Sequence, residues 1–152
     1  MPLAAGFRRS YGRCALKLAG AMAAAPAGYH TVTPYLVVKD VSALIEFVNR
    51  AFGARERMRM PRPDGSISHA EVELGDSVIM MGESESLSGL MPGVIHLYVD
   101  DVDASYRTAL QAGALSLREP SDQPHGDRMA GVKDGFGNQW WIAAPVPQTA
   151  KR

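Results

Sequence analysis

The chain contains an internal repeat, and this repeat restricts the possible folds more than any other feature of the sequence. The stretch LVVKDVSALIEFVNRAFGA, beginning at Leu36, aligns with LYVDDVDASYRTALQAGA, beginning at Leu97. The matched pairs are Leu36 and Leu97, Val38 and Val99, Asp40 and Asp101, Val41 and Val102, Ala43 and Ala104, and Ala51 and Ala112. Two copies are too few for a solenoid. In a chain of 152 residues they predict two similar modules that share one hydrophobic core.

Both copies have the same order of predicted elements. A short apolar strand (32–38 or 94–99) leads to an aspartate suited to cap a helix, and apolar residues then recur at helical spacing. Gly53 and Gly113 are placed to end the two helices as left-handed caps. The further predicted strands are 55–60, 67–74 and 77–81 in the first copy, and 115–120, 128–133 and 139–144 in the second. The sequence therefore predicts an α+β fold of two βαβββ modules, at residues 31–82 and 93–145.

Alternation along the strands assigns side chains to two faces of the predicted sheet. In SHAEVEL the apolar residues are predicted to lie beneath the helices, which leaves His69 and Glu71 on the opposite face. In VIHLYV the same reasoning leaves His96 and Tyr98 on that face, and the repeat adds Tyr35. An antiparallel sheet often has one solvated face. A face that mixes tyrosine, histidine, methionine and carboxylates is more typical of a lined cleft.

The segment DGFGNQWWIAA contains both tryptophans of the chain, side by side. A strand sends neighbouring side chains to opposite faces, so one indole is predicted to be buried and the other to face the cleft. We expect Trp140 to pack under a helix and Trp141 to lie on the cleft face. The preceding DGFGN predicts a tight turn, with glycine where the backbone needs positive φ.

Charge and composition restrict the partners of the protein. The formal net charge is zero, which gives no electrostatic reason to expect nucleic acid or a membrane surface as a partner. The single cysteine, Cys14, excludes an internal disulfide and is compatible with the cytoplasm. No stretch approaches the roughly 20 apolar residues that a membrane-spanning helix needs.

Residues 1–30 differ from the rest of the chain. They hold four of the 16 basic residues and no acid, so the remaining 12 basic and 16 acidic residues give 31–152 a net charge of −4. We predict a basic leader at 1–30, either a disordered extension, with Met22 as a possible true start, or a targeting segment. A single domain is then expected at 31–145, followed by a short tail at 146–152.

The paired modules resemble the vicinal oxygen chelate superfamily, which includes glyoxalase I, bleomycin-resistance proteins and extradiol dioxygenases. The resemblance is carried by VVKDV and YVDDVDA at the strand-to-helix joins, and it covers about residues 31–145. The segments SHAEVELGDSVIMMGE and PSDQPHGDRMAGVKDGFGNQWWIA are similar to a glyoxalase-like subgroup related to the phosphonate-operon protein of bacteria. The resemblance implies a cupped eight-stranded mixed sheet with helices on its outer face, usually completed in a homodimer.

The resemblance also implies where a divalent metal would bind, namely on the first and last strand of each module. The corresponding positions hold Thr33 and Val94 on the first strands, and Met80 and Trp141, within one residue, on the last strands. Valine, methionine and tryptophan offer a hard divalent cation no suitable oxygen or imidazole nitrogen. We therefore expect the standard metal site to be absent, and we predict no cofactor.

Three polar residues support an alternative to a protein without metal. His69, Glu71 and His96 share the predicted cleft face, and two histidines with one carboxylate can bind a divalent metal at a displaced site. The same residues could act as acid and base without metal, or they could be partly solvated strand residues. Arg128 could clamp an anionic ligand or form a surface ion pair.

The sequence thus predicts a protein that binds a small organic molecule in a concave cleft, without the standard divalent metal. Metal-free relatives in the bleomycin-resistance branch bind a drug in such a cleft at a dimer interface. The predicted ligand-binding residues are Tyr35, Met80, His96, Tyr98, Arg128 and Trp141. The alternatives are a metal-dependent lyase, isomerase or dioxygenase that uses His69, Glu71 and His96, and a cleft whose side chains only fill the core of a dimer.

Overall fold

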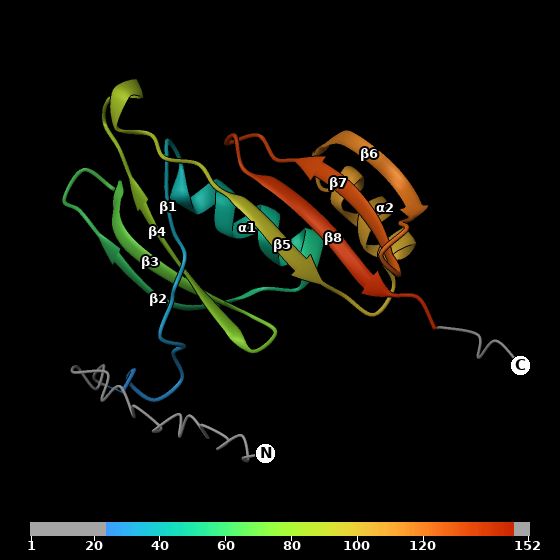
Figure 1. Ribbon diagram of the computed structural model, residues 1–152. Coiled ribbons are helices and arrows are strands. Elements are labelled where there is room, and N and C mark those ends of the chain that lie inside the picture. Colours follow the sequence, from blue (N-terminus) through green and yellow to red (C-terminus); the bar gives the residue numbers. More distant parts are fainter. Residues whose placement is uncertain (1–23, 148–152) are drawn as a thin grey trace, which may run out of the picture.

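The computed structural model describes residues 24–147, which form two modules of one helix and four strands each (Figure 1). The first module contains β1 (Tyr35–Val38), α1 (Val41–Phe52), β2 (Arg55–Pro61), β3 (Ile67–Leu74) and β4 (Ser77–Glu83). The second contains β5 (Val94–Tyr98), α2 (Val102–Gln111), β6 (Leu115–Asp122), β7 (Asp127–Lys133) and β8 (Gln139–Pro145). A short 3-10 helix, Leu87–Gly89, lies in the connection between the modules. The predicted α+β fold with two βαβββ modules is confirmed.

Most of the predicted leader and tail, residues 1–23 and 148–152, lies outside the described residues, so the nature of these segments stays a prediction. Residues 24–30, which we assigned to the leader, are described and contact the first module. No helix within the described range 24–147 is long and apolar enough to cross a membrane.

Both sheets have the same topology. The strand orders are β1-β4-β3-β2 and β5-β8-β7-β6, so the eight strands hydrogen-bond as two mixed sheets of four. In each sheet the first strand pairs in parallel with the last, and the other pairs are antiparallel. Tyr35 lies opposite Met80 in the first sheet, and His96 lies opposite Trp141 in the second. The sequence repeat is therefore a structural repeat with matching register.

The aspartates at the strand-to-helix joins cap the helices as expected. Asp40 Oδ1 accepts a hydrogen bond of 2.9 Å from the backbone N–H of Ala43, and Asp101 Oδ1 accepts an equivalent bond of 2.9 Å from Ala104. Such a side chain satisfies one of the backbone donors that a helix leaves free in its first turn. Gly53 ends α1 in the left-handed conformation, with φ of 72°.

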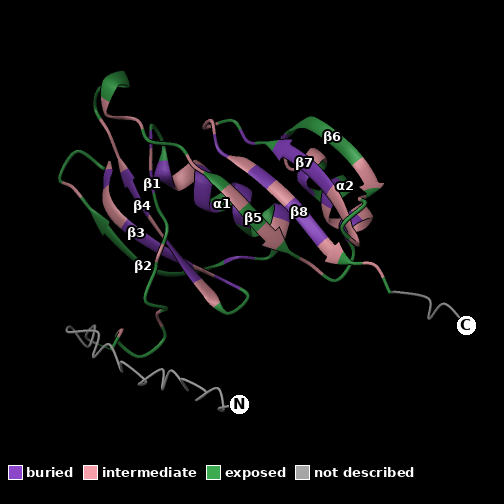
Figure 2. Ribbon diagram, in the orientation of Figure 1, coloured by how far each residue is buried: buried purple, intermediate pink, exposed green. Residues whose placement is uncertain are grey.

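One hydrophobic core joins the two modules. Trp140 of β8 is fully buried, and its ring lies 5.1 Å from that of Phe52 and 6.5 Å from that of Phe47, both on α1. The helix of the first module therefore packs against Trp140 of the second, and α1 also packs against α2. Figure 2 shows buried positions along α1, β3, β4 and β8, whereas the edge strand β2 is exposed throughout. Charged residues on an edge strand keep its unpaired backbone from recruiting another sheet.

Candidate functional site

An aromatic surface lies on the face of the second sheet opposite the helices. Trp141 on β8 is flanked by His96 on β5 and by Gly131 on β7, its partners in the strand register. The rings of His96 and Tyr98 meet edge to face, with centroids 4.9 Å apart. We call His96, Tyr98, Trp141 and Gly131 the aromatic platform. Tyr98 is 65% exposed and Trp141 is half-buried, so the platform is accessible from one side.

Gly131 lets the Trp141 indole lie against the sheet. A Cβ atom at position 131 would come within 2.8 Å of Cζ3 of Trp141, closer than side-chain contacts allow. The indole Nε1 donates a hydrogen bond of 3.3 Å to Oε1 of Gln139, which fixes the ring in its plane. The indole is therefore held flat over a glycine and stays half-buried.

A second group of side chains lies on the corresponding face of the first sheet and forms a hydrogen-bonded chain. The hydroxyl of Tyr35 lies 3.2 Å from Nδ1 of His69, and Nε2 of His69 lies 3.1 Å from Oε1 of Glu71. The hydroxyl of Tyr29 donates a bond of 2.5 Å to Oε2 of Glu71. We call Tyr35, His69, Glu71 and Tyr29 the polar chain. Glu71 is only 4% exposed, whereas Tyr35 is 47% exposed.

The polar chain holds Glu71 in its charged form. Burial alone would raise the pKa of Glu71, but the hydrogen bonds from Tyr29 and His69 outweigh it and keep that pKa below the ordinary value. The hydrogen bond to the same carboxylate raises the pKa of Tyr29. Arg57 stacks over the Tyr29 ring, with Cζ 4.7 Å from the centroid, and donates to the carbonyl of Gly28. The segment before β1 is thus fastened to the first sheet.

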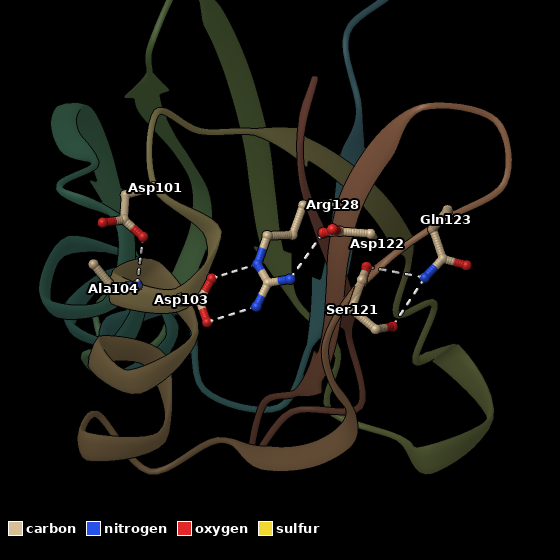
Figure 3. Close-up of polar contacts among 7 residues, drawn as sticks. All are labelled: Asp101, Asp103, Ala104, Ser121, Asp122, Gln123 and Arg128. Atoms are coloured by element: carbon tan, nitrogen blue, oxygen red, sulfur yellow. Dashed lines mark hydrogen bonds and ion pairs between the residues drawn. The ribbon is translucent and has the colours of Figure 1, made fainter. Parts of the chain in front are cut away.

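Arg128 does not reach either group. On β7 it lies on the same face as Ala130 and Val132, which are fully buried on the helix side. Its guanidinium donates bonds of 2.6 and 2.9 Å to Asp103 on α2 and a bond of 2.8 Å to Asp122 on β6 (Figure 3). These bonds lower the pKa of Asp103 and raise that of Arg128. The structure therefore shows the surface ion pair, one of the two roles considered for Arg128, and a ligand contact by Arg128 stays a prediction.

The residues at the standard metal positions do not fit a metal. Met80 and Trp141 carry no hard donor atom, and Thr33 uses its hydroxyl to donate to the carbonyl of His30. Within residues 24–147, no three His, Cys, Asp or Glu side chains are arranged to hold an ion. The structure pairs His69 with Glu71 but places His96 on the other sheet, against Tyr98. The displaced site of three ligands is thus not formed within one chain.

Two residues of these sites were missed in the sequence. Gly131 carried a usable signal, because a glycine inside a strand often marks a close approach of another group. Tyr29 carried none, because it lies in the segment assigned to the leader and meets Glu71 42 residues away. The remaining predicted ligand-binding residues fall into two groups, Tyr35 with Met80 on the first sheet, and His96 and Tyr98 with Trp141 on the second.

Paired βαβββ modules that share one core are the architecture of the vicinal oxygen chelate class of proteins. The chain belongs to the Glyoxalase/Bleomycin resistance protein/Dioxygenase superfamily, whose family model matches residues 28–142.

Relatives of known sequence and of known structure agree with this membership. Uncharacterised proteins of Mycobacterium bovis and of Mycobacterium tuberculosis H37Rv are each 38% identical over 127 residues, which is 76% of this chain and 83% and 74% of theirs. The crystal structure of TioX from Micromonospora sp. ML1 is 25% identical, with a TM-score of 0.66 over 76% of this chain and 98% of that one. A family enzyme from Burkholderia phytofirmans PsJN, 20% identical, shares the fold with a TM-score of 0.63 over 75% and 97% of the two chains.

Proposed function

We propose that this protein binds a small, planar organic molecule on the aromatic platform of the second module, without the standard divalent metal. The single observation that carries the proposal is the half-buried Trp141 indole, held flat over Gly131. It occupies the position where metalloenzymes of the superfamily place a metal ligand.

The chemistry of the platform favours a planar aromatic ligand. An indole offers a large rigid surface, and offset stacking adds about 0.5–1.5 kcal/mol to the burial of apolar area. The edge-to-face pair of His96 and Tyr98 can bound one side of a stacked ring and supply a hydrogen bond to its polar substituents. Met80 and Tyr35 lie on the equivalent face of the first module and remain predicted ligand contacts. The metal-dependent alternative has less support, because within residues 24–147 no third ligand joins His69 and Glu71.

We also propose that the protein is a homodimer, as the family resemblance implies. Strand β5 lies at the edge of its sheet and has 70% exposed Val94 and 65% exposed Tyr98 beside an unpaired backbone. A second copy would cover this apolar edge and the exposed side of the aromatic platform. Light scattering is expected to give twice the mass of one chain, and Val94→Lys to give one chain mass. A single-chain mass at all concentrations would contradict the dimer.

Binding can be tested by a thermal-shift screen followed by titration. Wild type, Trp141→Leu and Arg128→Gln are compared against planar aromatic compounds such as quinoline carboxylates, naphthols and acridines, with and without EDTA. A ligand at 100 times its Kd is expected to stabilise the fold by about 2.7 kcal/mol. We expect Trp141→Leu to lose at least about tenfold in affinity, or roughly 1.4 kcal/mol, and Arg128→Gln and EDTA to change nothing. Failure of every compound to bind, or equal binding by Trp141→Leu, would refute the proposal.

Two finer expectations stay predictions. The single cysteine, Cys14, is compatible with the cytoplasm, and fractionation of the native host would test that location. Membership of the subgroup related to the phosphonate-operon protein rests on the two quoted segments alone.

A further inference from the structure

We propose that the basic segment 1–23 docks, within its own chain, in a groove of the described domain that has an apolar floor and an acidic rim. We call this surface the acidic groove. It lies between β5, the turn from β3 to β4 and the start of α2. The proposal does not rest on ligand binding by the aromatic platform, because the apolar side chains that β5 contributes to the groove pack toward the core, on the opposite face from the platform.

The floor of the acidic groove is apolar surface that the two modules cover only in part. The groove has a volume of about 740 Å³, and its apolar lining consists of Phe52, Leu74, Ile79, Ile95, Leu97 and Val99. Leu74 and Ile79 are buried, whereas the other four are half-buried. Helix α2 packs mainly against β6, β7 and β8, which leaves the helix side of the edge strand β5 partly open. A groove of this size and lining suits the apolar side chains of a docked segment.

Three carboxylates form the rim of the groove. Asp76 lies in the turn between β3 and β4, and Asp100 and Asp101 lie between β5 and α2. All three are exposed. Within residues 24–147, no basic side chain forms an ion pair with any of them. The described part of the chain therefore leaves the negative charge of this rim without a cationic partner.

The segment 1–23 is complementary to both parts of the groove. It carries Arg8, Arg9, Arg13 and Lys17 and no acid, whereas the rest of the chain has 12 basic and 16 acidic residues. In FRRSYGRCALKL, which begins at Phe7, aromatic and aliphatic residues are interleaved with the basic ones. Exposed ion pairs contribute little individually. We therefore expect apolar contacts with the floor to provide most of the affinity and the charges to select this groove.

The connection to the domain allows docking within one chain. Val32 and Pro34 line the groove, so the chain enters the first module beside it. A segment of 23 residues spans up to about 75 Å when extended, whereas a domain of this size has a radius of gyration of about 14 Å. A short tether gives an effective concentration of about 1 mM. Contacts that would be weak between separate molecules are therefore sufficient within the chain.

The docking can be tested by paramagnetic NMR of the full chain. Cys14 is the single cysteine and lies inside the segment, so a nitroxide spin label can be attached without any substitution. The label broadens signals of nearby methyl groups, and its reduced form provides the reference spectrum. The methyl groups of Ile79 and Ile95 report on the groove. Ile67 serves as the distant reference, because it lies at the other end of β3 from Leu74, about 23 Å away at 3.3 Å per residue.

Selective broadening in the groove is the expected result. At an effective concentration of about 1 mM, a contact with a Kd of the same size is occupied about half of the time. We therefore expect the signals of Ile79 and Ile95 to lose at least about half of their intensity, and Ile67 to lose much less. In 1 M salt, where the screening length falls to about 3 Å, the loss at Ile79 and Ile95 is expected to decrease.

Two pairs of substitutions test the role of the rim. Asp76→Asn combined with Asp100→Asn is expected to restore the signals of the groove methyl groups toward those of the reduced sample. Glu85→Gln combined with Glu119→Gln is the matched control, because it removes two exposed carboxylates outside the groove. This control is expected to keep the broadening. Asp101 is left unchanged because it caps α2.

Three results would overturn the proposal. One is an equal loss of intensity at Ile67 and Ile95, and another is a loss that the Asp76 and Asp100 substitutions leave unchanged. The third uses a mixture of spin-labelled chain with isotope-labelled chain that carries no spin label. Groove broadening in that mixture would assign the groove to the segment of a second copy. None of these results affects stacking on Trp141, which the titration measures separately.

Discussion

The indole Nε1 of Trp140 donates a hydrogen bond of 2.9 Å to Oδ2 of Asp134, the first residue of the DGFGN turn. The same carboxylate accepts from the backbone of Phe136 and from the backbone and side chain of Asn138. Both Asp134 and Asn138 are buried. The turn is thereby fixed to the core, and the strand that follows it sends Trp140 inward and Trp141 to the platform.

Replacing Asp134 is expected to destabilise the fold strongly. Asp134→Ala leaves several buried donors without a partner, at a cost of about 1–3 kcal/mol for each such group. Asp134→Asn keeps an acceptor oxygen and is expected to cost less. Urea denaturation of both variants measures the free energy of unfolding. Equal stability of Asp134→Ala and the wild type would show that the turn does not depend on this carboxylate.

The two tryptophans are expected to differ in their contribution to stability. Trp140→Leu opens a cavity between α1 and β8 and removes the bond to Asp134, so we expect a loss of about 3–5 kcal/mol. Trp141→Leu removes a half-buried ring outside the core, for which we expect about 1 kcal/mol or less. Denaturation followed by far-UV circular dichroism compares them without relying on tryptophan fluorescence. A larger loss of stability in Trp141→Leu than in Trp140→Leu would contradict the assignment of Trp140 to the core.

Gly131→Ala tests whether a glycine at this position is needed for the Trp141 indole to lie against the strand. The added methyl group would contact the Trp141 ring at 2.8 Å, so the indole has to move away from the strand. We expect overpacking to cost about 1–3 kcal/mol of stability. We also expect it to lower the affinity for planar ligands. Gly135→Ala adds a methyl group in open space and serves as the control. Unchanged affinity in Gly131→Ala would indicate that the ligand does not stack on the indole.

Lowering the pH is expected to reduce the stability of the wild-type fold, because it protonates Glu71. The pKa of Glu71 is lower in the folded state than the ordinary value of 4.5, so its stabilising effect is complete above that value. The effect is lost as the pH falls through the folded-state pKa. We expect the melting temperature of the wild type to fall more steeply than that of Glu71→Gln between about pH 5 and 3. Parallel curves for the two proteins would contradict the hydrogen bonding of this carboxylate.

Local patterns in the sequence were enough to predict most of the fold. The predicted strand 67–74 matches β3, and both helices begin after the predicted aspartate caps. Alternation placed Glu71 and Trp141 on one face and Trp140 in the core, as found. The first strand is shorter than predicted. It begins at Tyr35, because this is the first residue of the segment that pairs with β4, opposite Met80.

The candidate sites were predicted only in part. Alternation identified His69, Glu71, His96 and Trp141 as residues of one face, but it could not divide them between two sheets. Alternation puts Arg128 on the face of the buried Ala130, but it could not show that Asp103 of α2 would meet the guanidinium there. Tyr29 was assigned to the leader, since a contact across 42 residues leaves no periodic trace.

The sequence by itself determined the two modules, their helix caps and the face on which each strand residue lies. These features depend on neighbours a few positions apart, so periodicity and a repeat can reveal them. Only the tertiary structure decided that Tyr29 fastens Glu71, that Gly131 supports Trp141 and that α1 covers Trp140 of the other module. Such contacts depend on the path of the whole chain and on the space between side chains, which no local pattern records.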